Sequence, residues 1–174
     1  MEKKGAILIL SGPSGCGKST LLKNVYKDIN DYYFSISTTT RSPRIGEKEG
    51  VDYLYVSKEE FEEDIKNGHF LEWAEVHGNY YGTSLKPINK ALKKGKLVIF
   101  DIDVQGHEIV RKKLNDIVTS VFITTPSLDE LERRLTDRKT DSNSVILKRL
   151  ENARYEIKSF QKYDYFIVND DLEK

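Results

Sequence analysis

The residues best suited to do chemistry form a glycine-rich loop close to the N-terminus. The segment Gly12-Pro-Ser-Gly-Cys-Gly17-Lys18-Ser19 matches G-x-x-x-x-G-K-[S/T], which is typical of a phosphate-binding loop. Its glycines let the backbone take positive φ and turn successive N–H groups toward an anion at the positive end of the next helix. We expect Lys18 to neutralise the β- and γ-phosphates of a nucleoside triphosphate, and the Ser19 hydroxyl to ligate Mg²⁺.

The expected triphosphate contacts include the whole loop and the residue after it. They are Gly12, Pro13, Ser14, Gly15, Cys16, Gly17, Lys18, Ser19 and Thr20. Cys16 is the only cysteine. We interpret it as a small neutral residue near a phosphate and not as a nucleophile, although a helix N-terminus can lower the pKa of a thiol. The alternative for the segment is a glycine-rich turn that only joins a strand to a helix.

Two carboxylates follow a later apolar run. Asp101 and Asp103 come directly after residues 97–100. Because α/β folds bind ligands at the carboxyl ends of their parallel strands, we expect one of the two, Asp101, to order the Mg²⁺ shell through water. The alternative for each is a helix cap or a loop aspartate.

The elements that must position these residues alternate along the chain. Apolar runs at residues 6–10, 97–100, 118–123 and 165–168 predict buried parallel strands. Helices are expected over residues 18–29, 87–94, 105–114, 128–138 and 145–160, and Ser57-x-x-Glu60 and Ser127-x-x-Glu130 are capping-box starts. This order predicts an α/β fold with helices on both faces of the sheet. Residues 35–84 do not follow this alternation of strands and helices, and we expect them to form a small, partly antiparallel insertion.

Composition limits the function classes. The chain has 174 residues, which suits one compact domain, and its 28 basic and 28 acidic residues cancel. A net charge of zero gives no field that would favour nucleic acid or an acidic membrane. The apolar run 6–10 is too short for a signal peptide or a membrane span, and a single cysteine suits a reducing compartment, so we expect a cytoplasmic protein. His69, His77 and His107 have no convincing partner sets and are interpreted as surface or packing residues.

Five segments resemble guanylate kinases, and the resemblance covers nearly the whole chain. They are Ser37-Thr-Thr-Thr-Arg41-Ser-Pro-Arg44-x-Gly46-Glu47-x-x-Gly50-x-Asp52-Tyr53, Phe70-Leu-Glu72-Trp73, Gly78-Asn-Tyr-Tyr81-Gly82-Thr83, Asp101-Ile-Asp103-x-Gln105-Gly106 and Val168-Asn-Asp-Asp171. The resemblance implies one guanylate-kinase-like domain over residues 1–174, with a parallel-sheet P-loop kinase core. It also implies a mixed α/β insertion over 35–84 that binds the monophosphate, and a helical lid over 134–149.

The same resemblance implies an activity and its residues. The activity is Mg²⁺-dependent phosphoryl transfer from ATP to GMP, and to dGMP, in purine nucleotide metabolism and GMP recycling. The implied phosphate contacts of GMP are Ser37, Arg41, Arg44, Tyr53 and Tyr81, and the implied guanine contacts are Glu72, Thr83 and Asp103. The implied catalytic set is Lys18, Arg41, Arg134, Arg138 and Arg149.

The chemistry of the acceptor residues agrees with these roles. Arg41 and Arg44, three apart with a proline between them, can aim two planar donor forks at one phosphate. A carboxylate at Glu72 can accept two hydrogen bonds from guanine, whereas adenine would present an acceptor there. Without the resemblance, Glu72 would be an exposed strand carboxylate, the arginines surface charges, and Tyr80 and Tyr81 packing aromatics.

The expected lid leaves one residue choice open. Arg134 and Arg138 lie four apart on one helix face, where like charges repel unless an anion lies between them. Glu130 can instead pair with Arg134 on a solvated face, and Arg133 competes with Arg134 for the working position. Guanylate kinases usually have Arg-Gly at the lid turn, and this chain has Arg138-Lys139, so a stiffer hinge is expected.

Two other functions fit parts of the pattern. A guanylate-kinase-like interaction module binds a protein at the acceptor site but typically lacks the loop lysine or the lid arginines. A kinase for AMP or a pyrimidine nucleotide would not need Glu72 and Thr83. The chain is expected to act as a monomer or homodimer. Guanylate kinases usually continue beyond the Val168–Asp171 motif with a further helix, and its absence would expose apolar sheet surface.

Overall fold

A computed structural model of the chain describes residues 5–76, 78–137 and 142–171. Its main sheet has five strands in the order β2-β7-β1-β8-β9, and every neighbouring pair is parallel. These strands are β1 (Ala6–Ser11), β2 (Tyr32–Phe34), β7 (Leu97–Asp101), β8 (Val118–Thr124) and β9 (Tyr165–Val168). The predicted α/β core with a parallel sheet is confirmed.

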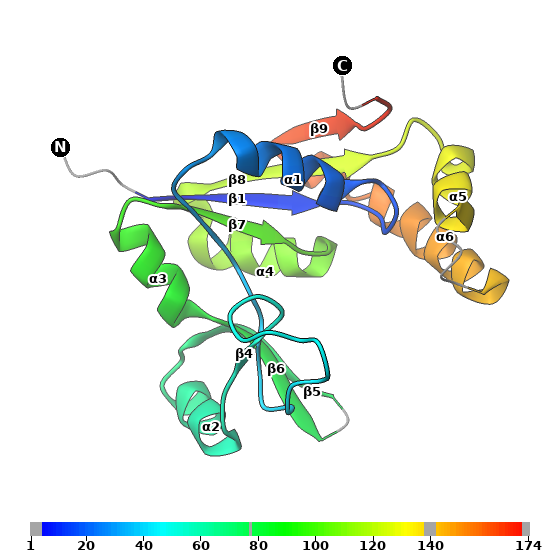
Figure 1. The fold of residues 1–174 in the computed structure, drawn as a ribbon. Helices are drawn as coiled ribbons and strands as arrows, with labels where there is room; N and C mark the ends of the chain where they lie inside the picture. The colour runs from blue at the N-terminus through cyan, green and yellow to red at the C-terminus, as the bar shows by residue number, and fades with distance from the viewer. Residues whose placement is uncertain (1–4, 77, 138–141, 172–174) are drawn as a thin grey trace.

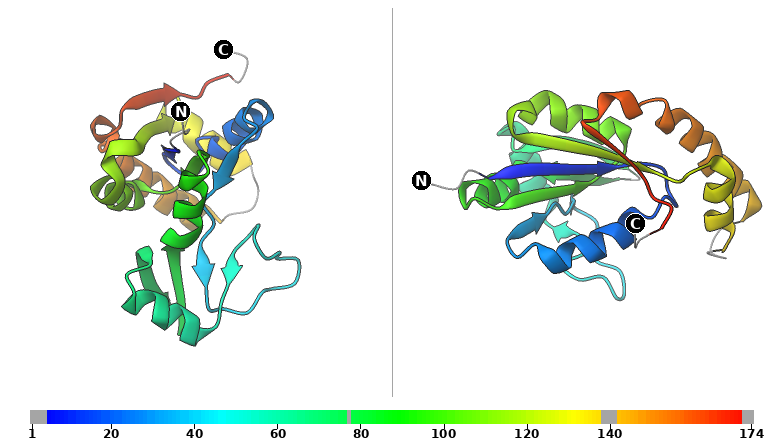
Figure 2. Two further views of the ribbon diagram at one scale, coloured as in Figure 1. Left: turned by 90° about the vertical axis from the view of Figure 1, so that its left-hand side faces the viewer. Right: turned by 90° about the horizontal axis from the view of Figure 1, so that it is seen from above.

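Helices cover both faces of this sheet, as predicted, with α1 and α4 on opposite sides (Figures 1 and 2). The helices are α1 (Lys18–Asp28), α2 (Lys58–Lys66), α3 (Leu85–Lys93), α4 (Val104–Leu114), α5 (Leu128–Asp137) and α6 (Asn143–Ile157), with short 3₁₀ turns at Asn115–Ile117 and Phe160–Lys162. Among the described residues, every helix is too short or too polar to cross a membrane.

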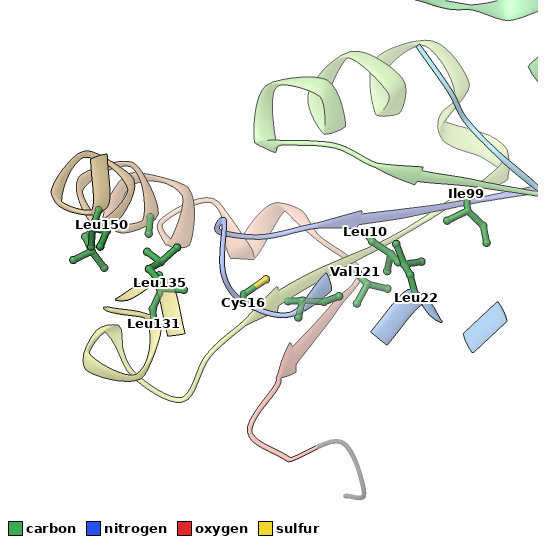
Figure 3. Packing of buried hydrophobic residues seen from close by; sticks show 11 residues of the cluster. Leu10, Cys16, Leu22, Ile99, Val121, Leu131, Leu135 and Leu150 are labelled. Carbon is green, nitrogen blue, oxygen red and sulfur yellow. The ribbon is translucent and has the colours of Figure 1, made fainter. Parts of the chain in front are cut away.

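Successive side chains of β1 point to opposite faces of the sheet, and the hydrophobic core therefore has two halves, one on each face. Ile7 and Ile9 face α3 and α4 and pack with Val110, whereas Leu10 faces the other side and packs with Leu22 of α1. The half on the α1 side continues through the buried Cys16 to α5 and α6, as Figure 3 shows. The phosphate-binding loop is therefore built into the hydrophobic core and not laid over it.

One strand was not predicted, and the burial predicted for another was wrong. The short strand β2 was missed, although it pairs with β7 at one edge of the sheet. The run 165–168 does form a strand, but its side chains are exposed and not buried, with Tyr165 at 62% and Val168 at 49% of full exposure. The reason is position, because β9 is an edge strand that pairs with β8.

A second, smaller sheet accounts for the insertion. Its strands are β4 (Leu54–Tyr55), β3 (Thr38–Thr39), β6 (Asn79–Ser84) and β5 (Phe70–Val76), in that order, and its pairings are mixed. Helix α2 packs on it through Phe61, which stacks on Phe70 and Tyr80. Ser57 and Glu60 form the predicted capping box, with both reciprocal hydrogen bonds present. Figure 2 shows this sheet as a lobe beside the core.

Candidate active site

The phosphate-binding loop has the conformation that its glycines allow. Gly12, Gly15 and Gly17 have φ of 145°, 96° and 93°, in the region that side chains avoid. A Cβ at Gly12 would lie 1.9 Å from the carbonyl oxygen of Ile123, and one at Gly17 would lie 2.2 Å from the side-chain nitrogen of Asn169. The loop therefore needs glycine for both backbone angle and space.

A cleft of about 360 Å³ opens over this loop, at the N-terminus of α1. The residues that line it are Gly12, Ser14, Gly15, Gly17, Lys18, Ser19, Thr20, Asp101, Ile102, Asp103 and Glu156. The ammonium of Lys18 donates to the Gly12 carbonyl at 2.7 Å and lies 3.9 Å from Oδ1 of Asp101. Burial raises the pKa of Asp101, and the charge of Lys18 opposes that rise. The Lys18 ammonium and three carboxylates, those of Asp101, Asp103 and Glu156, thus line the same cleft.

Two further acidic residues, Asp103 and Glu156, line the cleft. Asp103 caps α4, because its carboxylate accepts from the Gly106 N–H at 2.8 Å, so the alternative reading of a helix cap holds at this position even though the residue also lines the cleft. Glu156 was missed at the sequence level. It reaches the cleft from α6, and burial raises its pKa while Lys18 lowers it. A lone carboxylate within a polar helix carries no local signal of this placement.

The thiol of Cys16 points into the core and not into the cleft. The residue has no exposed surface, and burial raises its pKa against the opposing charge of Lys18. Its backbone carbonyl accepts a hydrogen bond from Asn169 Nδ2 at 2.7 Å. Its backbone N–H donates to the Pro13 carbonyl at 3.1 Å, so in this structure both polar backbone groups of Cys16 are bound within the protein.

The expected lid residues meet the loop from two helices. Arg149 of α6 donates to the Ser14 hydroxyl at 2.7 Å. Arg134 of α5 pairs with Glu130 at 2.7 Å, as in the alternative interpretation. Its Nη1 also approaches the loop, because a Cβ added at Gly17 would lie 3.8 Å from it. Arg133 is turned away, with a side chain 63% exposed and paired with Glu130. Arg134 is thus the better placed of the two, while Arg138 and the lysine after it lie outside the described residues, as does His77.

Arg41, which is expected at the acceptor phosphate, is surrounded by a cage of hydrogen-bonded and aromatic side chains. Both oxygens of Glu47 accept from Nη2 of Arg41 at 2.8 and 2.9 Å, and the Arg41 cation lies 5.4 Å from the centre of the Tyr53 ring. The hydrogen bond to Glu47 raises the pKa of Arg41 most, and a hydrogen bond with Tyr81 adds a smaller rise. The Tyr53 and Tyr81 rings meet edge to face at 6.1 Å. Three of the residues expected at the acceptor phosphate therefore lie together.

Glu47 is a member of this cage that received no role at the sequence level. Its carboxylate accepts from Arg41, from the Arg44 N–H at 2.7 Å and from the Tyr55 hydroxyl at 2.8 Å. These hydrogen bonds lower the pKa of the Glu47 carboxyl to about 2, and the bond from Arg41 has the largest effect. Arg44 and Ser37 are both exposed.

Glu72 and Thr83, two of the residues expected at the guanine, are in direct contact. The Thr83 hydroxyl donates to Oε1 of Glu72 at 2.6 Å, and Thr83 is only 8% exposed. One carboxylate oxygen of Glu72 thus has a donor within the protein. A carboxylate has further acceptor sites, so the pair is compatible with a planar base that offers donors.

Comparison with known proteins agrees with this geometry. A profile described as guanylate kinase matches residues 4–174. The chain belongs to the guanylate kinase family. It is 58% identical to a guanylate kinase from Sulfurimonas denitrificans, over 99% of this chain and 84% of that protein. It is 56% identical to one from Helicobacter pylori, over 97% and 81%.

A solved guanylate kinase supports the assignment in three dimensions. The crystal structure of the enzyme from Anaplasma phagocytophilum matches with a TM-score of 0.67 and 39% identity, and the match covers 99% of this chain and 81% of that chain. The predicted family membership is therefore confirmed over nearly the whole sequence.

Proposed function

We propose that this guanylate kinase transfers a phosphoryl group from ATP to GMP or dGMP in the cytoplasm and gives ADP and the diphosphate. The observation that carries the proposal is the presence, in one chain, of both half-sites: a phosphate loop with Lys18 facing its cleft, and an acceptor site with the Glu72–Thr83 pair. A binding-only relative needs the second half-site but not the first.

In this proposal the donor cleft holds the triphosphate. The loop amides and Lys18 bind the β- and γ-phosphates, and Arg134, Arg138 and Arg149 spread positive charge over the group in transfer. Ser19 and, through water, Asp101 would hold Mg²⁺, since hydroxyl and carboxylate oxygens in one cleft are the donors that this ion prefers. Bound Mg²⁺ would neutralise charge on the phosphates.

The acceptor half-site orients the attacking phosphate. Arg41, with Arg44, Ser37, Tyr53 and Tyr81, binds the phosphate of GMP. Its oxygens are already ionised, so the transfer needs positioning and no general base. Glu72, Thr83 and Asp103 read the guanine. Adenine would place a lone pair against the Glu72 carboxylate, and an unpaired buried acceptor is costly.

Closure over both nucleotides is part of the proposal, because water would otherwise compete as acceptor. Residues 35–84, as the monophosphate-binding insertion, and 134–149, as the lid, should move when both substrates bind. Hydrogen exchange with and without ATP and GMP measures this. Equal exchange in both segments would contradict closure.

The main experiment is a coupled assay of ADP release with GMP, dGMP, AMP, UMP and dTMP offered in parallel. Turnover is expected with GMP and dGMP. Turnover with AMP or a pyrimidine nucleotide in preference to GMP would favour a different monophosphate kinase, and no turnover with GMP would refute the proposal.

Two variants separate the half-sites. Lys18→Met should abolish turnover and leave GMP binding in calorimetry close to that of the parent, whereas Lys23→Met, on the exposed side of α1, should behave as the parent. Retained activity in Lys18→Met would remove the loop from the mechanism. Glu72→Gln should lose selectivity for GMP over AMP, and unchanged selectivity would mean that another residue reads the base.

A further inference from the structure

The strand that carries Glu72 has an irregularity next to that residue. In the pairing of β5 with β6, Phe70 lies opposite Ser84, but Glu72 lies opposite Thr83. Leu71 is therefore an extra residue, a β-bulge. A regular ladder from Phe70 would place Leu71 opposite Thr83, so the bulge is what sets Glu72 beside its threonine.

At the bulge, one side chain packs in the core and the next one lies at the proposed base-reading site. Leu71 is 2% exposed and packs in the core half under α3 and α4, with Ile88 and Val110. Glu72, the next residue, reaches the hydroxyl of Thr83. A bulge re-aims side chains but disturbs the ladder hydrogen bonds, so its carbonyls need other partners.

Lys113, from the last turn of α4, donates to these carbonyls. Its ammonium lies 2.5 Å from the carbonyl oxygen of Leu71 and 3.4 Å from that of Phe70. These are charge-assisted hydrogen bonds from a core helix to the strand at which the insertion's second half begins. The strand is thus held both through the packing of Leu71 and through its backbone.

We propose that Lys113 is a positioning residue for guanine recognition: it fixes the bulge at Leu71 and thereby the orientation of Glu72 toward the base. The inference rests on the proposed function, because it concerns the base-reading half-site of that reaction. Lys113 itself touches neither the phosphate loop nor the donor cleft among the contacts of the described residues.

The test is steady-state kinetics of Lys113→Met, which keeps the aliphatic stem and removes the donor. With GMP as variable substrate, KM should rise about tenfold, as expected when one charge-assisted hydrogen bond no longer orients its neighbour, while kcat and the KM for ATP change less than about twofold. The preference for GMP over inosine monophosphate, which lacks the amino group that Glu72 would read, should fall. Lys113→Arg retains a cationic donor and should restore most of both values.

Lys112→Met is the matched control, since it removes the same charge one residue away on the exposed surface of α4. If Lys113→Met and Lys112→Met have equal KM for GMP and equal base preference, the inference is wrong. It is also wrong if Lys113→Met raises the KM of both nucleotides together, as a general loss of structure would. Should Lys113→Met not fold, Lys113→Gln carries the same comparison. If the parent protein itself does not phosphorylate GMP, the proposed function fails and takes this inference with it.

Discussion

Replacing Asn169 with alanine should destabilise the phosphate loop, although Asn169 lies 153 residues from Cys16 in the sequence. Asn169 follows β9 and is 8% exposed, and its amide nitrogen donates to the Cys16 carbonyl at 2.7 Å. The same nitrogen occupies the space beside Gly17, where a Cβ would lie 2.2 Å from it. Asn169→Ala therefore removes a buried donor and the atoms that support the loop at once.

The size of the effect follows from these contacts. A buried carbonyl left without its donor costs about 1–3 kcal/mol. A loss near the middle of that range, about 2 kcal/mol, lowers the melting temperature of a chain of this length by about 4–8 °C. If about 1 kcal/mol of the loss falls on the loop conformation that binds phosphate, the KM for ATP rises about fivefold. The KM for GMP should stay close to the parent value.

The assay combines thermal melting by circular dichroism with kinetics in ATP. Asp170→Ala is the control, because its side chain is exposed and its backbone carbonyl, which accepts from Arg134, is retained. A melting temperature and a KM for ATP equal to those of Asp170→Ala would refute the claim that Asn169 supports the loop.

Three further predictions concern other parts of the molecule. Glu47→Gln should raise the KM for GMP and not that for ATP, because Arg41 loses its bidentate carboxylate, and equal changes in both constants would contradict this. Burial, and then the charge of Arg111, hold the pKa of His107 below its ordinary 6.5. The unfolded chain thus binds this proton at higher pH than the folded one, so the free energy of unfolding in urea should fall as pH drops below about 7. The slope is at most about 1.4 kcal/mol per pH unit for this group, and His107→Phe should remove that part of it. Gly12→Ala should abolish ATP binding in calorimetry, since its Cβ would meet a carbonyl oxygen at 1.9 Å where φ is 145°.

An element of the fold could be predicted from the sequence where the residues that determine it are contiguous. The apolar run of β1 and the loop after it are contiguous, so their strand, turn and helix could be predicted locally. Strand β2 has three half-buried residues, and its identity rests on pairing with β7, more than sixty residues away. Strand β9 has the composition of a buried strand, but its place at the edge of the sheet is a property of topology.

In the site, too, some features depend on contiguous residues and others on residues far apart in the sequence. Glu156 and Asn169 reach the loop from far along the chain, the latter 153 residues from Cys16. No local pattern marks Glu156, and the family resemblance includes Asn169 in its last segment without giving it a role. The choice between Arg133 and Arg134 did have a local signal. Leu131 and Leu135 are buried, and on a helix residue 133 points away from that face while residue 134 lies beside it. The apolar period of α5 therefore already favoured Arg134.

Helix α4 runs from the phosphate-loop cleft to the strand that carries Glu72. Its first end is capped by Asp103, which lines the donor cleft, and its last turn holds the bulge before Glu72 through Lys113. The helix between them is fixed to the core by buried residues such as Val110. Because Leu71 is buried in that same core, we expect the motion proposed for residues 35–84 to be smaller at Glu72, the next residue, than at Arg41 on the loop after β3. In the proposed reaction the guanine would therefore contact a residue that moves little, and closure would mainly bring the acceptor phosphate toward ATP.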